Sequence, residues 1–260
     1  MNATIAAQMT AADLLKLRKK RGTLIWALVL ALAPLVIFFI VRAAQHSSNP
    51  LKYGPAGGTG GYIDGLRIVA LFFGPLASIM IGVEAGTGDA ASGVFRDLVA
   101  TGRSRLALFA TRVPAALIVS SLVTALAYGL LMIGTFAFSS GARTPDAATL
   151  LNGLGFSLLA TGSVCAVAVG FAALTNSRPA ALTTLIGWHL VASPILSSIS
   201  SLGSSRKLLL GQALVHFSPV HVTERGGTVA MTQGTALAVL AAWLACFLAL
   251  GAWRTSRMDA

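Results

Sequence analysis

Six stretches of roughly 20 mainly apolar residues follow one another along the chain, and they restrict its fold more than any other feature. Within a bilayer the backbone must satisfy its own hydrogen bonds, so stretches of this length predict membrane-spanning helices. Hydrophobic residues make up 55% of the sequence and charged residues only 10%, which excludes a small soluble domain. We therefore predict an all-α integral membrane protein whose transmembrane domain covers 23–260, with spans at about 23–41, 66–83, 113–139, 149–175, 181–198 and 235–253.

The basic residues lie at the ends of the apolar stretches, although the formal net charge is +11. Anionic lipid and the positive-inside rule favour bases at these positions, so the charge indicates a lipid bilayer as partner and not nucleic acid. Five bases lie between Lys16 and Arg21, before the first span, whereas Arg42 and Lys52 follow it. This asymmetry places the N-terminus inside, and six spans then place the C-terminus and the segment 84–112 on the cytoplasmic side.

Residues 1–22 alternate leucines with bases, which predicts a cytoplasmic amphipathic helix lying on the membrane surface. Thr10 and Asp13 are spaced as in a capping box, so we expect the helix to begin at Thr10. The alternative is that these residues form the n-region of a signal peptide. The apolar stretch after them is longer than a signal sequence requires, and further spans follow it.

Two segments between the spans have sequence patterns that predict their structure. Residues 42–64 are rich in glycine and proline, which predicts a loop. Residues 208–217, inside the segment 199–232, are apolar but only half a span long, which predicts short re-entrant or extracellular helices before the sixth span. A poorly packed outer loop is the alternative. Small residues recur every four positions in the second and fourth spans and predict close helix packing: Gly74, Ser78, Gly82, Gly162, Ala166 and Gly170.

The segment 84–112 is polar but has helical patterning of its own. Asp89 or Ser92 is placed to cap a short helix, and Gly102 is placed to end it. Pairs spaced four residues apart form an apolar face with charges at its rim: Val94, Phe95, Leu98 and Val99, with Arg96, Asp97, Arg103 and Arg105. Glu84 and Arg112 bracket the segment, either as an ion pair at its base or as two separately solvated charges.

The sequence lacks the motifs that would indicate a nucleotide-binding, metal-binding or catalytic site in this chain. None of the five lysines stands in a P-loop, and neither a H-E-x-x-H zinc motif nor a G-x-S-x-G nucleophile elbow occurs. Charged residues are nearly absent from the centres of the spans, so no ion or proton relay is visible. His189 is the ionisable group at depth; it either lines a substrate path or interface, or is a neutral histidine bonded to a neighbouring helix.

The segment 84–112 resembles the corresponding segment of the type-2 family of ATP-binding-cassette exporter permeases. The matching positions are Glu84, Gly93-Val94, Leu98-Val99-Ala100-Thr101, Arg105 and Arg112. Val94, Gly102 and Arg112 stand where Thr, Pro and Lys are common in the family. The six spans, the basic N-terminal helix and the half-span segment before the last span agree with the layout of that family.

The resemblance implies a permease subunit that pairs with a second permease copy, identical or not, in a bacterial inner or plasma membrane. It also implies that the short helix after the second span is a coupling helix, which docks on a separate ATPase subunit. ATP and Mg²⁺ would bind to that subunit, so no cofactor or catalytic residue is expected in this chain. The alternatives are an ion-coupled secondary transporter, which needs intramembrane charges, an intramembrane hydrolase, which needs a catalytic constellation, and a structural membrane subunit.

Overall fold

Six helical stretches in this computed structural model are long and apolar enough to cross a membrane, so the chain is a multi-pass helical membrane protein. The structure describes residues 3–91, 99, 102, 104–220 and 229–257, and every secondary-structure element within them is helical. The six candidate spans are Arg21–Ser48, Gly58–Gly88, Arg105–Ala137, Ala147–Thr175, Arg178–Ser198 and Gln233–Ser256. The predicted number of spans is confirmed, but several helices extend well beyond the predicted bounds.

Residues 42–64 are mostly helical, and the prediction of a loop there is wrong outside 49–57. Helix α2 (Arg21–Ser48) runs past its predicted end, and α3 (Gly58–Arg67) begins the second span. At least one glycine of α3 is a contact point and not a break. A Cβ atom added at Gly65 would collide with the end of the Leu131 side chain in α6 (Arg105–Ala137), so glycine there leaves room for the neighbouring helix.

The second span continues from α3 through a wide π-helical turn, η1 (Ile68–Phe72), into α4 (Phe73–Ala91). Asp89 lies within the bounds of α4, and Ser92, the other capping candidate from the sequence, lies outside the described residues. Gly102 does end a turn: its backbone has a φ of +81°, and its N–H donates to the carbonyl of Val99 at 3.0 Å. Glycine adopts this left-handed conformation without the steric penalty of a Cβ atom.

The predicted N-terminal helix is α1 (Ala3–Lys19), but Thr10 is not its N-cap. The helix begins earlier, and the Thr10 hydroxyl donates back to the carbonyl of Ala6 at 3.0 Å. Asp13 has another role, because it pairs with Lys16 at 2.9 Å and accepts a hydrogen bond from Thr111 of α6 at 2.9 Å. This long-range contact, which local sequence patterns do not reveal, anchors α1 to the third span.

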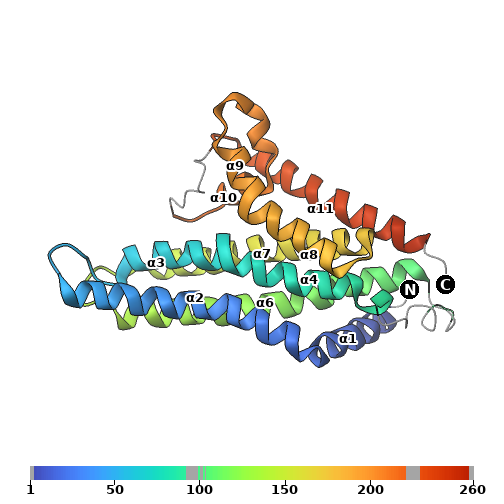
Figure 1. Ribbon diagram of the computed structural model, residues 1–260, viewed down its shortest axis with the longest axis horizontal. Coiled ribbons are helices and arrows are strands. Elements are labelled where there is room, and N and C mark those ends of the chain that lie inside the picture. The colour runs from blue at the N-terminus through green and yellow to red at the C-terminus, as the bar shows by residue number, and fades with distance from the viewer. Residues whose placement is uncertain (1–2, 92–98, 100–101, 103, 221–228, 258–260) are drawn as a thin grey trace.

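Helices α2, α4, α6 and α7 (Ala147–Thr175) pack side by side as a bundle (Figure 1). Asp146 caps α7 through the N–H of Thr149, and hydrogen bonds from Thr149 hold the pKa of Asp146 below its ordinary value. The fifth span consists of α8 (Arg178–Gly187), a second π-helical turn η2 (Trp188–Ala192) and α9 (Ser193–Ser198), and the sixth span is α11 (Gln233–Ser256).

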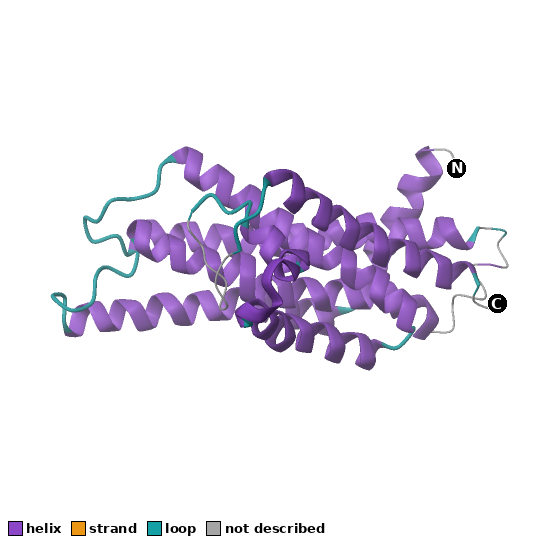
Figure 2. Ribbon diagram, turned by 90° about the horizontal axis from the view of Figure 1, so that it is seen from above, coloured by secondary structure: helices purple, strands orange, loops and turns teal. Residues whose placement is uncertain are grey.

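The fifth and sixth spans rise away from the bundle as they leave the end of the molecule at which both termini lie (Figure 1). Figure 2 also shows both termini at this end. We call this the terminal end. Between the two spans lie a 3₁₀ segment, η3 (Ser200–Leu208), and the short helix α10 (Leu210–Val215). Most residues of α10 are buried, so the alternative of a poorly packed loop at 208–217 is wrong.

Small residues hold α4 tightly against α7. A Cβ atom at Gly82 would lie 2.6 Å from the carbonyl oxygen of Cys165, and one at Gly86 would lie 2.6 Å from that of Val169. At Gly170 a Cβ atom would collide with the backbone of Phe247 in α11. The predicted close packing is confirmed at Gly82 and Gly170. The contacts at Gly82 and Gly86 hold α4 against α7, and the contact at Gly170 holds α7 against α11, the sixth span.

We expect Gly82→Ala to lower the stability of the protein by about 1–3 kcal/mol, because the new methyl group forces α4 away from α7. The measurement is thermal unfolding in detergent. Gly129→Ala is the matched control, since nothing lies within 4 Å of a Cβ atom at Gly129 and alanine favours the helix there. Equal unfolding temperatures for the two variants would contradict this account of the packing.

Candidate functional site

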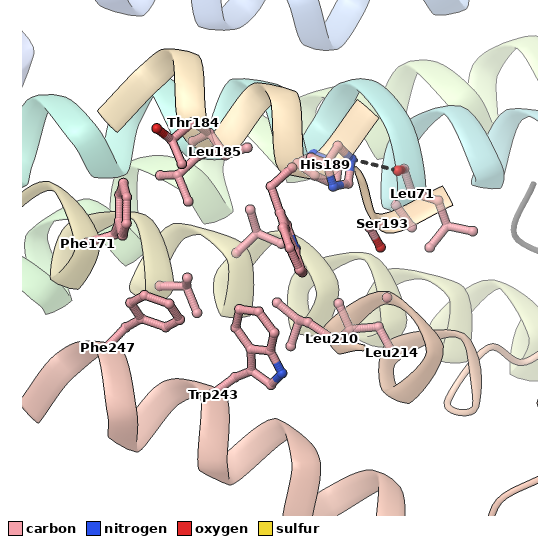
Figure 3. Close-up of a pocket in the computed structure, with 17 residues that line it drawn as sticks. Leu71, Phe171, Thr184, Leu185, His189, Ser193, Leu210, Leu214, Trp243 and Phe247 are labelled. Atoms are coloured by element: carbon pink, nitrogen blue, oxygen red, sulfur yellow. Dashed lines mark hydrogen bonds between the residues drawn. The ribbon is translucent and has the colours of Figure 1, made fainter. Parts of the chain in front are cut away.

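One π-helical turn lies in the second span and the other in the fifth span, and the two turns lie next to each other. In such a turn a backbone N–H bonds to the carbonyl five residues earlier in the chain. The N–H of Phe73 bonds to the carbonyl of Ile68, and the N–H of Ser193 bonds to the carbonyl of Trp188. His189 of η2 joins the two turns, because its Nε2 lies 2.9 Å from the carbonyl oxygen of Leu71 in η1 (Figure 3). π-Helical turns occur frequently at functional sites, where they redirect side chains and free backbone groups.

A cavity of about 200 Å³ lies beside this contact. Its walls come from the second, fourth, fifth and sixth spans and from α10, and its lining side chains converge on one space (Figure 3). None of the lining residues carries a formal charge at neutral pH when His189 is neutral. The lining residues are Ala70, Leu71, Pro75, Ile79, Val164, Val167, Phe171, Thr184, Leu185, Trp188, His189, Ser193, Leu210, Gly211, Leu214, Trp243 and Phe247.

Four aromatic side chains form a continuous row along the cavity. The ring centroids lie 5.8 Å apart between Trp188 and Trp243, 5.4 Å between Trp243 and Phe247, and 5.9 Å between Phe247 and Phe171. Trp243 is held in place because its Nε1 donates to the carbonyl of Leu208 at 2.8 Å. These distances fall in the range of favourable aromatic contacts, so the row is a preformed wall.

His189 is bonded to a neighbouring helix, which confirms one of the two alternatives raised by the sequence. It also lines the cavity, and a substrate path there stays a prediction. A carbonyl oxygen only accepts hydrogen bonds, so Nε2 of His189 must carry the proton that it donates to Leu71. In the neutral ring, Nδ1 is then a hydrogen-bond acceptor. The cavity wall is mostly apolar, and the side chains in it that can accept a hydrogen bond are the ring of His189 and the hydroxyls of Thr184 and Ser193.

A second polar group lies at the terminal end, around Glu84 of α4. The Glu84 side chain is buried, with its residue only 4% exposed. Its carboxylate lies 3.4 Å from Nζ of Lys20 and 3.1 Å from the guanidinium of Arg178, and it accepts a 3.1 Å hydrogen bond from Thr23. Arg178 also donates to the hydroxyl of Thr23 at 3.1 Å. We call these four residues the Glu84 cluster.

The Glu84 cluster joins elements that are far apart in the sequence. Lys20 stands between α1 and α2, where the backbone leaves the helical conformation, Thr23 lies in α2, and Arg178 begins α8. The position of α4 is therefore linked to the N-terminal helix, the first span and the fifth span. A buried carboxylate needs such partners, because an unpaired charge away from water is costly.

Glu84 pairs with Lys20 and Arg178, which differs from the Glu84–Arg112 ion pair that was one alternative from the sequence. Arg112 of α6 is buried and donates to the carbonyl of Gly86 in α4 at 3.4 Å, so it still joins the two helices at the base of the segment. It is not a separately solvated charge either. Nearby, Arg105 at the start of α6 donates to the carbonyl of Ser256 at the end of α11.

Most of the predicted docking face lies outside the described residues: Val94, Phe95, Arg96, Asp97, Leu98 and Arg103. Val99 is described as a helical residue, and Arg105 makes the contact with α11. The structure therefore describes the base of the segment 84–112 and how it is held, and the docking face stays a prediction.

No protein-family model matches this chain, and no curated protein matches it.

Proposed function

We propose that this chain is the membrane-spanning permease subunit of an ATP-driven exporter. Two such permease chains, identical or not, would work with separate ATPase subunits that bind ATP and Mg²⁺. In this proposal both termini and the segment 84–112 face the cytoplasm of a bacterial cell, and the segment docks on the ATPase through its apolar face. The chain itself holds no nucleotide and catalyses no reaction.

The observation that carries the proposal is the set of contacts around the base of the segment 84–112. Its two ends are held by buried polar groups, Glu84 on α4 and Arg112 on α6. Through Glu84 the base contacts the fifth span at Arg178, and through Arg105 it contacts the sixth span at Ser256. A displacement of the segment would therefore move both of the spans that lie against the bundle.

The same contacts provide a mechanical route to the cavity. The fifth span begins at Arg178, beside Glu84, and reaches the cavity at Thr184, Trp188 and His189. The pair α4 and α7 is tightly packed and forms the opposite wall. When ATPase subunits close, a rigid-body movement of the fifth span relative to this pair would open or close the cavity. Alternating access requires such an exchange between two packed states.

The alternative functions have less support. An ion-coupled transporter uses charged groups at membrane depth, and the charged clusters described here lie towards the ends of the spans. A hydrolase would need a nucleophile hydrogen-bonded to a base, and within the described residues no serine, threonine or cysteine side chain is hydrogen-bonded to His189. A purely structural subunit would not need a preformed cavity between its spans.

Co-purification tests the proposal. The full chain is expressed together with a candidate ATPase that has a P-loop, ideally one encoded in a neighbouring reading frame, and is isolated in detergent through a tag on the permease. We expect a stable complex whose ATP hydrolysis depends on the permease. A permease that purifies free of every candidate ATPase, with ATPase activity unaffected by its presence, would contradict the proposal.

A further inference from the structure

The cavity between the second, fourth, fifth and sixth spans is large enough for a compact molecule and has well-defined chemistry. An engineered apolar cavity of about 150 Å³ binds benzene, so a cavity of about 200 Å³ matches one substituted aromatic ring. A phospholipid with two acyl chains is far larger than this space. Size alone therefore favours a small ligand.

The walls restrict the ligand to a neutral molecule. None of the lining residues is an acid, a lysine or an arginine, so a charged ligand would lose its hydration without gaining an opposite charge. The row formed by Phe171, Trp188, Trp243 and Phe247 lies along one side, and aliphatic side chains such as Leu210 and Leu214 lie near it (Figure 3). Aromatic rings contact other rings favourably at their faces and edges.

The hydroxyls of Thr184 and Ser193 also line the cavity and can donate as well as accept, whereas His189 adds a group that only accepts. Its Nε2–H is used by the carbonyl of Leu71, which leaves Nδ1 as an acceptor. A ligand that carries an O–H or N–H group satisfies this acceptor, whereas a purely hydrocarbon ligand does not. Trp243 cannot serve in its place, because an indole N–H only donates, and it is used by the carbonyl of Leu208.

We infer that this cavity binds a neutral, single-ring aromatic molecule with one hydrogen-bond donor, of the phenol type, and that His189 accepts the donor's hydrogen bond. If the proposed function holds, such molecules are the class of compound that the exporter carries, and this last step rests on that function. Binding itself requires neither ATP nor a partner subunit.

Tryptophan fluorescence of the purified full chain provides the test, because two of the four tryptophans line the cavity. Trp26 and Trp253 are exposed and lie elsewhere, so both are replaced by phenylalanine to leave Trp188 and Trp243 as reporters. The probe is 4-bromophenol, whose bromine quenches indole fluorescence on contact. The comparison probes are 4-bromoanisole, which lacks the O–H group, and the anion 4-bromobenzoate.

We expect saturable quenching by 4-bromophenol, with affinity about threefold to tenfold higher than for 4-bromoanisole because of the one hydrogen bond. We expect no saturable quenching by 4-bromobenzoate. Val167→Phe places a ring in the cavity and should weaken binding at least about tenfold. Val191→Phe is the matched control, because Val191 is exposed and does not line the cavity, and it should leave binding unchanged. If Val167→Phe does not purify as a single species, Val164→Phe adds the same volume from the same helix.

Several results would overturn the inference. Quenching that never saturates, or that is equal in the Val167→Phe and Val191→Phe variants, means that the probe only partitions into detergent. Equal affinities for 4-bromophenol and 4-bromoanisole remove the role of His189. In nanodiscs made of phospholipid brominated on its acyl chains, quenching that Val167→Phe abolishes would show that a lipid chain occupies the cavity. The binding assay contains no ATPase and so does not depend on the proposed function. If the chain binds 4-bromophenol saturably but ATP-driven transport is not found, the result counts against the proposed function and not against this site.

Discussion

Replacing Glu84 by glutamine is expected to lower ATP-driven transport about tenfold while the ATPase subunits stay bound, which corresponds to roughly 1.4 kcal/mol of lost coupling. Glutamine keeps the size of the side chain and an oxygen that accepts from Thr23, but it removes the charge that attracts Lys20 and Arg178. Without this attraction, α4 and the start of the fifth span are no longer held together. A movement of the segment 84–112 would then be transmitted less effectively to the fifth span, which lines the cavity.

Glu84→Gln should lower the stability of the protein by less than the loss of a fully buried ion pair would. The side chains of Arg178 and Lys20 are about half exposed, which screens both interactions. We expect a loss of about 1–2 kcal/mol in thermal unfolding. A double-mutant cycle with Arg178→Met isolates the pair, and a coupling energy near zero would contradict the role given to Arg178.

Asp64→Asn is the matched control for Glu84→Gln. Asp64 also pairs with two arginines, Arg42 at 3.4 Å and Arg67 at 3.1 Å, but it lies in α3, away from the terminal end (Figure 1). Its removal should lower stability by less than Glu84→Gln does, because the side chain of Asp64 is more exposed, and it should leave the ratio of transport to ATP hydrolysis unchanged. If both variants change that ratio equally, Glu84 has only a structural role.

Phe95→Asp should have a different effect, because we expect it to prevent the ATPase from binding. An aromatic residue that anchors a docked helix contributes about 2–4 kcal/mol, and a carboxylate placed in its pocket adds a desolvation cost. Affinity for the ATPase should therefore fall at least about a hundredfold, as measured by co-purification and by titration with the isolated ATPase subunit. Binding that Phe95→Asp leaves intact would remove the docking role of the segment.

Leu51→Asp provides the comparison for Phe95→Asp. Leu51 is fully exposed in the loop 49–57, at the opposite end of the molecule from the termini (Figure 1). The substitution is of the same kind, an apolar residue changed to aspartate, but the site lies far from the base of the segment 84–112. We expect ATPase binding to change less than twofold.

The long apolar stretches made the six spans predictable, because hydrocarbon leaves the backbone no other way to satisfy its hydrogen bonds. The bounds were harder to predict. Residues 42–64 look like a loop by composition, yet Gly61 and Gly65 belong to a helix that packs closely on its neighbours. Glycine occurs in loops because its backbone is flexible, and at helix contacts because it has no side chain to keep two helices apart. Which of the two applies depends on the helix that lies beside it, which the local sequence does not reveal.

The two candidate sites were predictable only in part. His189 was notable in the sequence as a polar group at depth, and Glu84 as a charge at the end of a span. Their partners, Leu71 for His189 and Arg178 for Glu84, lie more than 90 residues away along the chain. The aromatic wall also comes from three separate spans. Two tryptophans within apolar stretches, Trp188 and Trp243, were the signal that could have suggested it.

Transport in sealed vesicles tests the central claim most directly. The permease and its ATPase are reconstituted together, and uptake of a fluorescent phenolic compound into inverted vesicles is measured with ATP, with a non-hydrolysable ATP analogue, and with ionophores that abolish ion gradients. The account predicts uptake that requires ATP hydrolysis, continues when the ionophores are added, and is lost in the Phe95→Asp variant. Uptake that needs no ATPase subunit and disappears with the ion gradient would contradict it and indicate a secondary transporter.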